Sequence, residues 1–210
     1  MNIKALSAAL GVALTTFAFT ANAQKTYTSG LATYDTEVRG QPAEGKLYFT
    51  PDSAATIVTF GAGTFKLLTT AKHTYLAVIL DIPVAGIKKA GVATPGELEE
   101  GAAAYPSFTF SPTTDTKTIS GFNCKRVVAK NSNGGKTYDI WVTNDVIVPN
   151  TAYPFYYSGI GGYPVQFTYF QQGQELSITI KTLTSSTAPA GTFAIGKDFE
   201  VGTMADLGGN

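Results

Sequence analysis

The strongest constraint on the fold is a series of short runs in which apolar and polar residues alternate and which end at turn signals. Runs rich in β-branched and aromatic residues cover residues 45–50, 55–60, 64–70, 74–80, 106–110, 120–130, 136–145, 163–170 and 175–183. Proline and glycine clusters such as Pro51-Asp52-Ser53 and Gly61-Ala62-Gly63 separate them. Roughly nine strands, mostly joined by hairpins, must curl to bury one face. We therefore expect a mainly β fold: a single, strongly curved antiparallel sheet, a half-barrel, with one or two short helices near its concave side.

The stretch "GIKKAGVATPGELEEGAAA" lacks this alternation. Within it, Thr94 precedes Pro95 and Glu97 follows three residues after the threonine, which is typical of a capping box with proline at the first helical position. We expect a helical insert at about residues 84–104, which would serve as a lid or as a fixed plug. The chain shows no repeat or linker, so residues 24–210 are predicted to form one domain. Residues 202–210 are expected to be weakly ordered.

The first 23 residues, "MNIKALSAALGVALTTFAFTANA", have the pattern of a secretory signal peptide. Lys4 provides the positive start, an apolar run follows, and Ala21-Asn22-Ala23 matches the cleavage pattern. The run is shorter than the ~20 residues that span a bilayer. We expect cleavage after Ala23 and a periplasmic or secreted protein. The alternative is a short N-terminal anchor. The residue after the cleavage position is not a cysteine, so no lipoprotein anchor is expected. No other stretch is long and apolar enough to span a bilayer, so no transmembrane segment is expected in the mature chain.

The charge balance argues against nucleic acid as a partner. The formal net charge is zero and Arg39 and Arg126 are the only arginines, whereas nucleic-acid binding requires clustered basic residues. The single cysteine, Cys124, lies in "SGFNCKRVV" and allows no internal disulfide. We expect its thiol to be a buried apolar side chain. The alternative is a reactive thiol activated by Arg126, which has the same strand parity.

No catalytic or metal-binding constellation is evident. His73 is the only histidine and no Gly-x-Ser-x-Gly elbow occurs. A metal site would recruit several His, Cys or clustered carboxylates. A carboxylate pair formed from distant strands would permit a cofactor-free hydrolase, but the expectation is a non-enzyme without cofactor or metal.

Aromatic residues crowd into "YPFYYSGIGGYPVQFTYF", residues 153–170. Strands favour aromatic residues, and the prolines and glycines here mark turns. Alternatively, these rings line the rim of a concave sheet and contact an amphipathic molecule, because tyrosine joins an apolar body to a polar tip.

Three ordered motifs carry a resemblance to a known family. They are a Gly-x-x-Cys-Lys strand with Gly121 and Cys124, a Tyr-x-x-Trp strand with Trp141, and a Gly-x-Pro turn with Pro164. Over residues 118–170 the chain resembles a family of secreted envelope proteins, a domain of unknown function, whose fold is similar to the LolA-like lipoprotein carriers. The resemblance implies a curved, incompletely closed sheet with helices near its concave side. In the carriers that concavity shelters acyl chains.

These observations predict a soluble exported binding protein that shelters a hydrophobic or lipid-like ligand, or an acylated peptide, in a concave sheet. The alternative is a structural or protein-interaction module of the cell envelope whose core is filled by the chain itself. Strand parity gives the candidate lining residues, and a register error of one residue would move each set to the other face. They are Leu76, Val78, Leu80, Tyr138, Ile140, Val142, Val165, Phe167, Tyr169, Leu176, Ile178 and Ile180.

Overall fold

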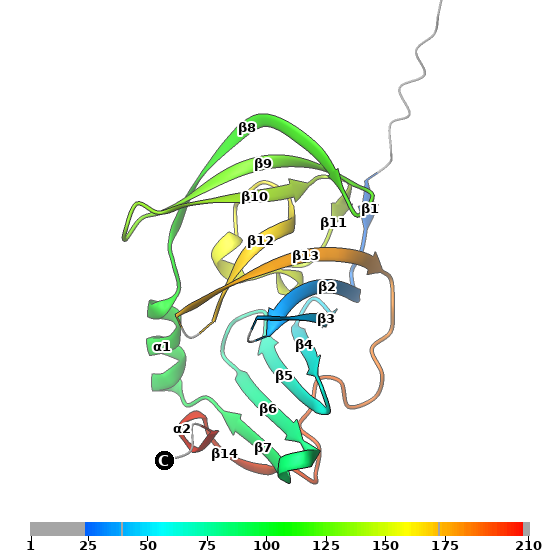
Figure 1. Cartoon of the computed structure of the whole chain (residues 1–210), viewed down its shortest axis with the longest axis vertical. Helices are drawn as coiled ribbons and strands as arrows, with labels where there is room; N and C mark the ends of the chain where they lie inside the picture. Colours follow the sequence, from blue (N-terminus) through cyan, green and yellow to red (C-terminus); the bar gives the residue numbers. More distant parts are fainter. Residues whose placement is uncertain (1–23, 39, 172, 208–210) are drawn as a thin grey trace, which may run out of the picture.

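The computed structural model describes residues 24–38, 40–171 and 173–207. It shows a mainly β protein built on one twelve-stranded sheet (Figure 1). The sheet curves strongly and stays open, with β14 at one edge and β8 at the other, so the predicted fold class is confirmed. The elements are β1 (Lys25–Thr26), β2 (Gly30–Val38), β3 (Gln41–Phe49), β4 (Ser53–Phe60), β5 (Gly63–Thr70), β6 (Leu76–Ile82), η1 (Pro83–Ala85), β7 (Ile87–Val92), α1 (Pro95–Ala104), β8 (Phe108–Ile119), β9 (Phe122–Asn131), β10 (Thr137–Thr143), β11 (Val146–Ile147), η2 (Asn150–Ala152), η3 (Phe155–Tyr157), β12 (Tyr163–Gln171), β13 (Gln174–Thr184), β14 (Glu200–Thr203) and α2 (Met204–Leu207).

The strand order is β14-β7-β6-β5-β4-β3-β2-β13-β12-β10-β9-β8. Hairpins join most neighbouring strands. In the middle of the sheet, β2 pairs with β13, which is distant in sequence. The pairing is antiparallel except between β14 and β7, which are parallel. β1 and β11 form a separate parallel pair. The sheet therefore consists of an N-terminal half, β2 to β7, and a C-terminal half, β13 to β8.

The inner face of the sheet is the face that carries the buried side chains of Tyr34 and Ile180, which are paired across β2 and β13. The main core lies on this face in the C-terminal half. It contains Val127, Tyr138, Ile140, Val165, Phe167 and Ile178 together with residues of the β11–β12 connection. Burial of each large aliphatic or aromatic side chain contributes about 1.5–3 kcal/mol, so this half dominates the stability of the fold.

The β11–β12 connection fills the inner side of the C-terminal half. Ala152, Tyr156, Tyr157 and Ile160 of this connection are all buried in the main core. The ring of Tyr157 stacks on Phe108 of β8 at a centroid distance of 5.6 Å. Part of the aromatic stretch seen in the sequence is thus core rather than rim, as its turn residues allow.

A second, smaller core lies on the outer face of β4 to β7. Ala55, Leu68, Ala77, Ile79 and Ala90 form it. The segment that follows β13 covers these residues with Phe193, Ile195 and Phe199. Lys66 Nζ anchors this cover by donating hydrogen bonds to the carbonyls of Gly191 and Ala194, at 3.1 and 3.0 Å. The outer face of the N-terminal half is therefore closed by the chain's own C-terminal segment.

The predicted helical insert is helical in its second part only. Residues 83–85 form η1, residues 87–92 form strand β7, and α1 begins at Pro95. Alternation is obscured in β7 because Lys88 and Lys89 are both exposed and Gly91 contacts Leu207 and Thr203 of the chain end. That contact also orders Glu200–Leu207, where the sequence suggested a weakly ordered tail. The capping box is confirmed: the Thr94 hydroxyl accepts from the Glu97 N–H, and the Glu97 carboxylate accepts from the Thr94 N–H.

Candidate functional site

Two rungs of the inner face cross β2 to β6 without interruption. In one, Tyr34, Gly45, Val58, Phe65 and Leu80 are successive cross-strand partners. Side chains on one face of neighbouring strands lie about 4.5–5.5 Å apart at Cβ, so the rung forms a continuous apolar row. The residue at position 45 must be glycine, because a Cβ there would lie 1.9 Å from the Tyr34 ring.

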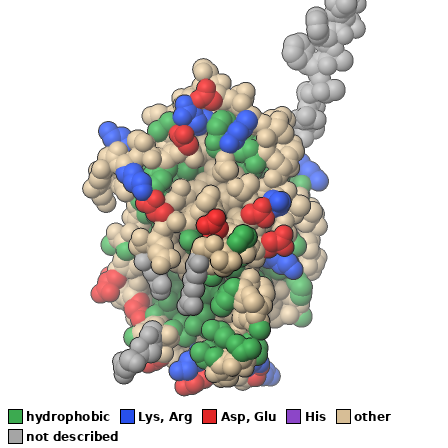
Figure 2. Space-filling model, in the orientation of Figure 1, with side chains coloured by type: hydrophobic (Ala, Val, Ile, Leu, Met, Phe, Trp, Pro, Cys, Tyr) green, Lys and Arg blue, Asp and Glu red, His purple; other side chains and the backbone are tan. Residues whose placement is uncertain are grey.

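The next rung repeats the pattern one step along the strands. Leu47, Thr56, Leu67 and Val78 are successive partners in it, and Leu76 lies one step further along β6. Most side chains of the two rungs in β4, β5 and β6 are aliphatic, and all are only partly buried. Figure 2 shows hydrophobic side chains gathered over β3 to β6 on the viewed face. We call the set Val58, Phe65, Leu67, Leu76, Val78 and Leu80 the apolar strip.

The structure places Leu76, Val78 and Leu80 together on the apolar strip, as their parity predicted. The other candidate lining residues lie in the C-terminal half. Tyr169 and Leu176 pair with each other and are partly buried. The rest are buried in the main core: Tyr138, Ile140, Val142, Val165, Phe167, Ile178 and Ile180. These seven positions pack against the chain itself.

The motif residues have structural positions. Gly121 forms a two-residue turn with Ser120, and both have positive φ, 85° and 50°, as a type I′ hairpin turn requires. Pro164 is buried at the start of β12. Trp141 pairs with Gln166, and Lys117 Nζ lies 4.0 Å from the centroid of its indole ring.

Cys124 is 1% exposed and free. Burial raises the pKa of its thiol to about 11, so the thiolate needed for nucleophilic or redox chemistry is scarce at neutral pH. Arg126 does not activate it, because its guanidinium pairs with Asp115 and Asp139, at 2.6 and 3.2 Å. In β9 the buried positions shift from an even-numbered residue, Cys124, to odd-numbered residues from Val127 onward, so the predicted face of Arg126 does not follow from that of Cys124. The Cys124 side chain therefore serves as core packing.

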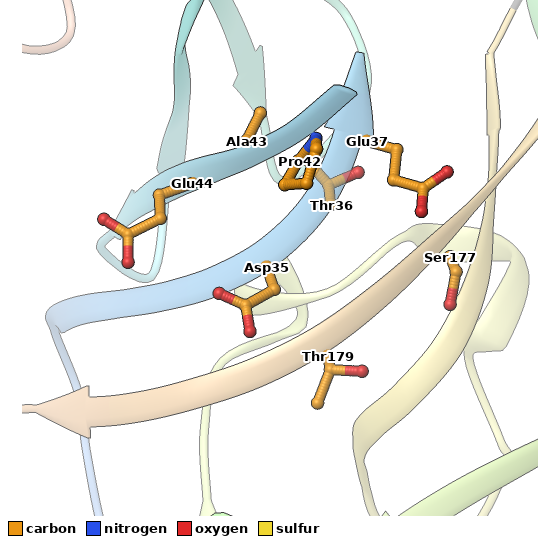
Figure 3. A pocket seen from close by; sticks show the side chains of 8 residues that line it. All are labelled: Asp35, Thr36, Glu37, Pro42, Ala43, Glu44, Ser177 and Thr179. Carbon is orange, nitrogen blue, oxygen red and sulfur yellow. The ribbon is translucent and has the colours of Figure 1, made fainter. Parts of the chain in front are cut away.

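A polar recess of about 380 Å³ lies at the turn end of the β2–β3 hairpin (Figure 3). Asp35, Thr36 and Glu37 of β2 line it, with Pro42 to Glu44 of β3 and Ser177 and Thr179 of β13. Thr36 pairs with Ala43 one inner-face step beyond Tyr34 and Gly45. The other six lining residues, Asp35 and Thr179 among them, have the opposite strand parity to Tyr34 and Ile180, so the recess opens mainly on the outer face and not on the apolar strip.

The recess is acidic. Three carboxylates line it, and Lys181 Nζ lies 2.9 Å from Asp35 Oδ2. This negative charge disfavours anions at the outer face of the β2–β3 hairpin. Within the described residues, no group of three or more His, Cys, Asp or Glu side chains is arranged to hold a metal ion.

His73 lies at the β5–β6 turn, with its ring centroid 4.8 Å from that of Phe155. Burial lowers the pKa of its imidazole. Its described contact is aromatic packing, with no serine or carboxylate bonded to the ring. Among residues 24–38, 40–171 and 173–207, no helix is both long and apolar enough to cross a membrane.

Parity in the sequence missed half of the apolar strip. Val58, Phe65 and Leu67 belong to runs that were assigned as strands, but no inner face was chosen for them. The signal was present, because Phe65 and Leu67 alternate with Thr64 and Lys66. The adjacent Leu67 and Leu68 obscured it, since only the tertiary structure shows that Leu68 belongs to the outer core.

No family model and no curated protein matches the chain. Two solved structures, of PNGF-II in the C2 and P21 space groups, are matched at TM-scores of 0.44 and 0.48 and at 14% and 13% sequence identity. The matches cover 83% and 86% of this chain but 30% and 32% of those chains, so this chain spans about a third of their length. At these scores the comparison supports no functional assignment, and it does not bear on the resemblance to the lipoprotein carriers.

Proposed function

We propose that this chain is an exported binding protein that shelters a hydrophobic, lipid-like ligand on the apolar strip. The observation that carries the proposal is the partial exposure of adjacent aliphatic side chains on β4, β5 and β6. Leu67 and Val78 are direct partners at its centre, and Phe65 and Leu80 are the next pair. Contiguous apolar surface rimmed by polar residues is typical of binding sites.

The two halves of the sheet have different roles in this proposal. The β11–β12 connection fills the C-terminal half, and the segment after β13 covers the outer face of the N-terminal half. The inner face of β4 to β6 is less completely covered. Each ligand methylene buried there would contribute about 0.8 kcal/mol, so an acyl chain would gain enough to bind. Export is part of the proposal on the strength of residues 1–23, which lie outside the described residues.

A second candidate function is a structural or protein-interaction module of the cell envelope. The filled C-terminal half favours it, because Tyr157 is fully buried there in a core that the chain itself packs. In this case a partner protein would cover the apolar strip. The two functions differ in whether the isolated protein takes up a small apolar molecule.

The test uses the mature chain, residues 24–210, and N-phenyl-1-naphthylamine, a neutral apolar dye that the acidic recess does not repel. We expect saturable dye binding that a long-chain alcohol displaces. Leu67→Gln and Val78→Gln should each weaken dye binding about tenfold, because each buries an amide without a partner. Val84→Gln is the matched control, since Val84 is 83% exposed on η1.

Absence of saturable dye uptake, or equal uptake by Val78→Gln and Val84→Gln, would contradict the binding function and favour the interaction module. Mass spectrometry of organic extracts from protein purified out of its native envelope identifies the natural ligand. N-terminal sequencing of the same material tests export, because the proposal expects Gln24 as the first residue.

A further inference from the structure

A second recess, of about 320 Å³, lies between the end of α1, the start of β8 and η3. Ala102, Tyr105 and Pro106 line it from the α1 side. The opposite wall is made by residues of β8 and η3 and their neighbours: Ser107, Phe108, Phe110, Phe155, Tyr156 and Ser158. Five of its nine lining residues are aromatic.

The rings of this aromatic recess are set at steep angles to one another. Tyr105 and Phe155 lie 5.2 Å apart with an interplanar angle of 86°, and Phe155 and Tyr156 lie 5.5 Å apart at 70°. Tyr105 stacks on Tyr156 at 5.4 Å. Tyr156 is buried in the main core, whereas Phe155 is 37% exposed. Rings of different orientation, packed on one another, therefore line the recess.

The helix end adds negative potential. α1 ends at Ala104 with Tyr105 as its C-cap, and no basic residue lies in its last turn. The carbonyl end of a helix carries a partial negative charge, and Ala102 lies in this last turn and lines the recess. No lysine or arginine is among the described lining residues.

Several aromatic rings elsewhere in this chain make cation–π contacts with lysine side chains. Lys117 lies over Trp141, Lys136 over Tyr138 and Lys88 over Phe199, with Nζ between 4.0 and 5.1 Å from the ring centroids. In the described part of the chain no lysine or arginine takes such a position over Tyr105, Phe155 or Tyr156. The ring of His73 contacts Phe155, and burial lowers the pKa of this imidazole, which disfavours its cationic form.

We propose that the aromatic recess binds a small organic cation, a quaternary ammonium or an alkylated amine. Ring faces attract a cation through their quadrupole, and a quaternary ammonium has low hydration and a greasy surface. The carbonyl end of α1 contributes attraction of the same sign. The volume is sufficient for a trimethylammonium group with a short tail.

The test uses the mature chain and two molecules of nearly equal shape: choline and its neutral carbon analogue, 3,3-dimethyl-1-butanol. Ligand-observed NMR follows the methyl protons, which ring currents shift upfield in an aromatic site. We expect saturable choline binding about threefold to tenfold tighter than that of the alcohol. Equal affinity of the two molecules, or no upfield shift of either, would overturn the proposal.

One single variant and one variant pair locate the site. Phe155→Leu keeps apolar contact but removes a ring, so it should weaken choline binding about threefold or more and leave alcohol binding within twofold. Ala102→Lys places a positive charge in the last turn of α1, which complements the helix dipole and therefore should not unfold the protein. It should weaken choline binding severalfold relative to Ala102→Gln, its neutral control. Unchanged choline affinity in both Phe155→Leu and Ala102→Lys would contradict the site, whereas dye binding by the apolar strip is unaffected in either outcome.

Discussion

The hydroxyl of Tyr157 donates a 2.6 Å hydrogen bond to the carbonyl of Thr168 in β12. Beside it, the hydroxyl of Tyr156 accepts a 3.0 Å bond from the N–H of Phe170. β10 pairs with Tyr163–Gln166 of β12, whereas β13 pairs with β12 as far as Gln171. The two tyrosines thus supply hydrogen-bond partners where β10 and β12 diverge, which fixes η3 inside the sheet.

Tyr157→Phe should lower the free energy of unfolding by about 1–3 kcal/mol, because it leaves the partly buried Thr168 carbonyl without this donor. Urea denaturation of the mature chain measures the change. Tyr153→Phe is the control: the Tyr153 hydroxyl bonds to the exposed Asn150, and its loss should cost less than about 0.5 kcal/mol. Equal effects of the two substitutions would show that Tyr157 does not anchor η3.

The Cys124 thiol should react with a thiol reagent at pH 8 at least about a hundredfold more slowly in the folded protein than in denaturant. Absorbance of the released chromophore measures both rates. Comparable reaction rates in the folded and the denatured protein would contradict burial of the Cys124 side chain and would favour the reactive-thiol alternative.

The same thiol predicts a dependence of stability on pH. Its pKa is raised from 9.0 to about 11 in the folded protein, so the unfolded chain loses this proton first as the pH rises. The corresponding stability is fully present below pH 9 and is lost as the pH rises to 11. Denaturation curves of the wild type and Cys124→Ala should therefore converge over this range. A constant difference between them would contradict the shift.

Phe193→Ala should open the outer core, because Phe193, in the segment after β13, packs against this cluster. Loss of a partly buried aromatic ring should cost about 1–3 kcal/mol. Hydrogen exchange should show the change in β5 and β6 and little change in β10. Uniform exchange throughout the sheet would indicate that the two halves do not open separately.

Thr94→Ala removes the hydroxyl that accepts from Glu97 N–H and should destabilise α1 locally by about 1 kcal/mol. Since no residue of α1 is buried, the midpoint of global unfolding should hardly move. Amide exchange in residues 97–104 should accelerate severalfold. Glu99→Gln, an exposed change on the same helix, serves as the control and should leave exchange unaltered.

Ser120→Asn should raise stability by on the order of 0.5 kcal/mol, because asparagine tolerates the positive φ at this position better than serine does. Gly121→Ala in the same turn should have the opposite effect, since alanine at φ +85° is strained. Thermal unfolding measures both. Destabilisation by Ser120→Asn would contradict a type I′ turn in solution.

Most of the hairpin strands and the α1 cap could be predicted from local pattern, because alternation and capping depend on neighbours in sequence. The strand β2 was missed although it lies at the centre of the sheet. Its inner-face residues Ala32, Tyr34 and Thr36 are mixed in size and polarity, since Tyr34 must lie across Gly45. Such a fit between two strands gives no regular apolar signal.

The apolar strip was predicted in part, through the parity of Leu76, Val78 and Leu80. The same reasoning selected Ile140, Val165 and Ile178, which are core residues. Strand parity predicts which side chains share a face of the sheet, but not which segment packs on that face. Here the β11–β12 connection packs on it. The aromatic recess likewise joins residues 102–110 and 155–158, which are distant in sequence.

By itself the sequence determined a mainly β chain, its hairpins, its capped helix and a thiol suited to burial. These features follow from backbone geometry and from the periodicity of side chains within single elements. Only the tertiary structure decided which face of each strand is covered, because that depends on long-range docking of η3 and of the segment after β13. The apolar side chains on the inner face of β4 to β6 are the ones that this docking leaves partly exposed.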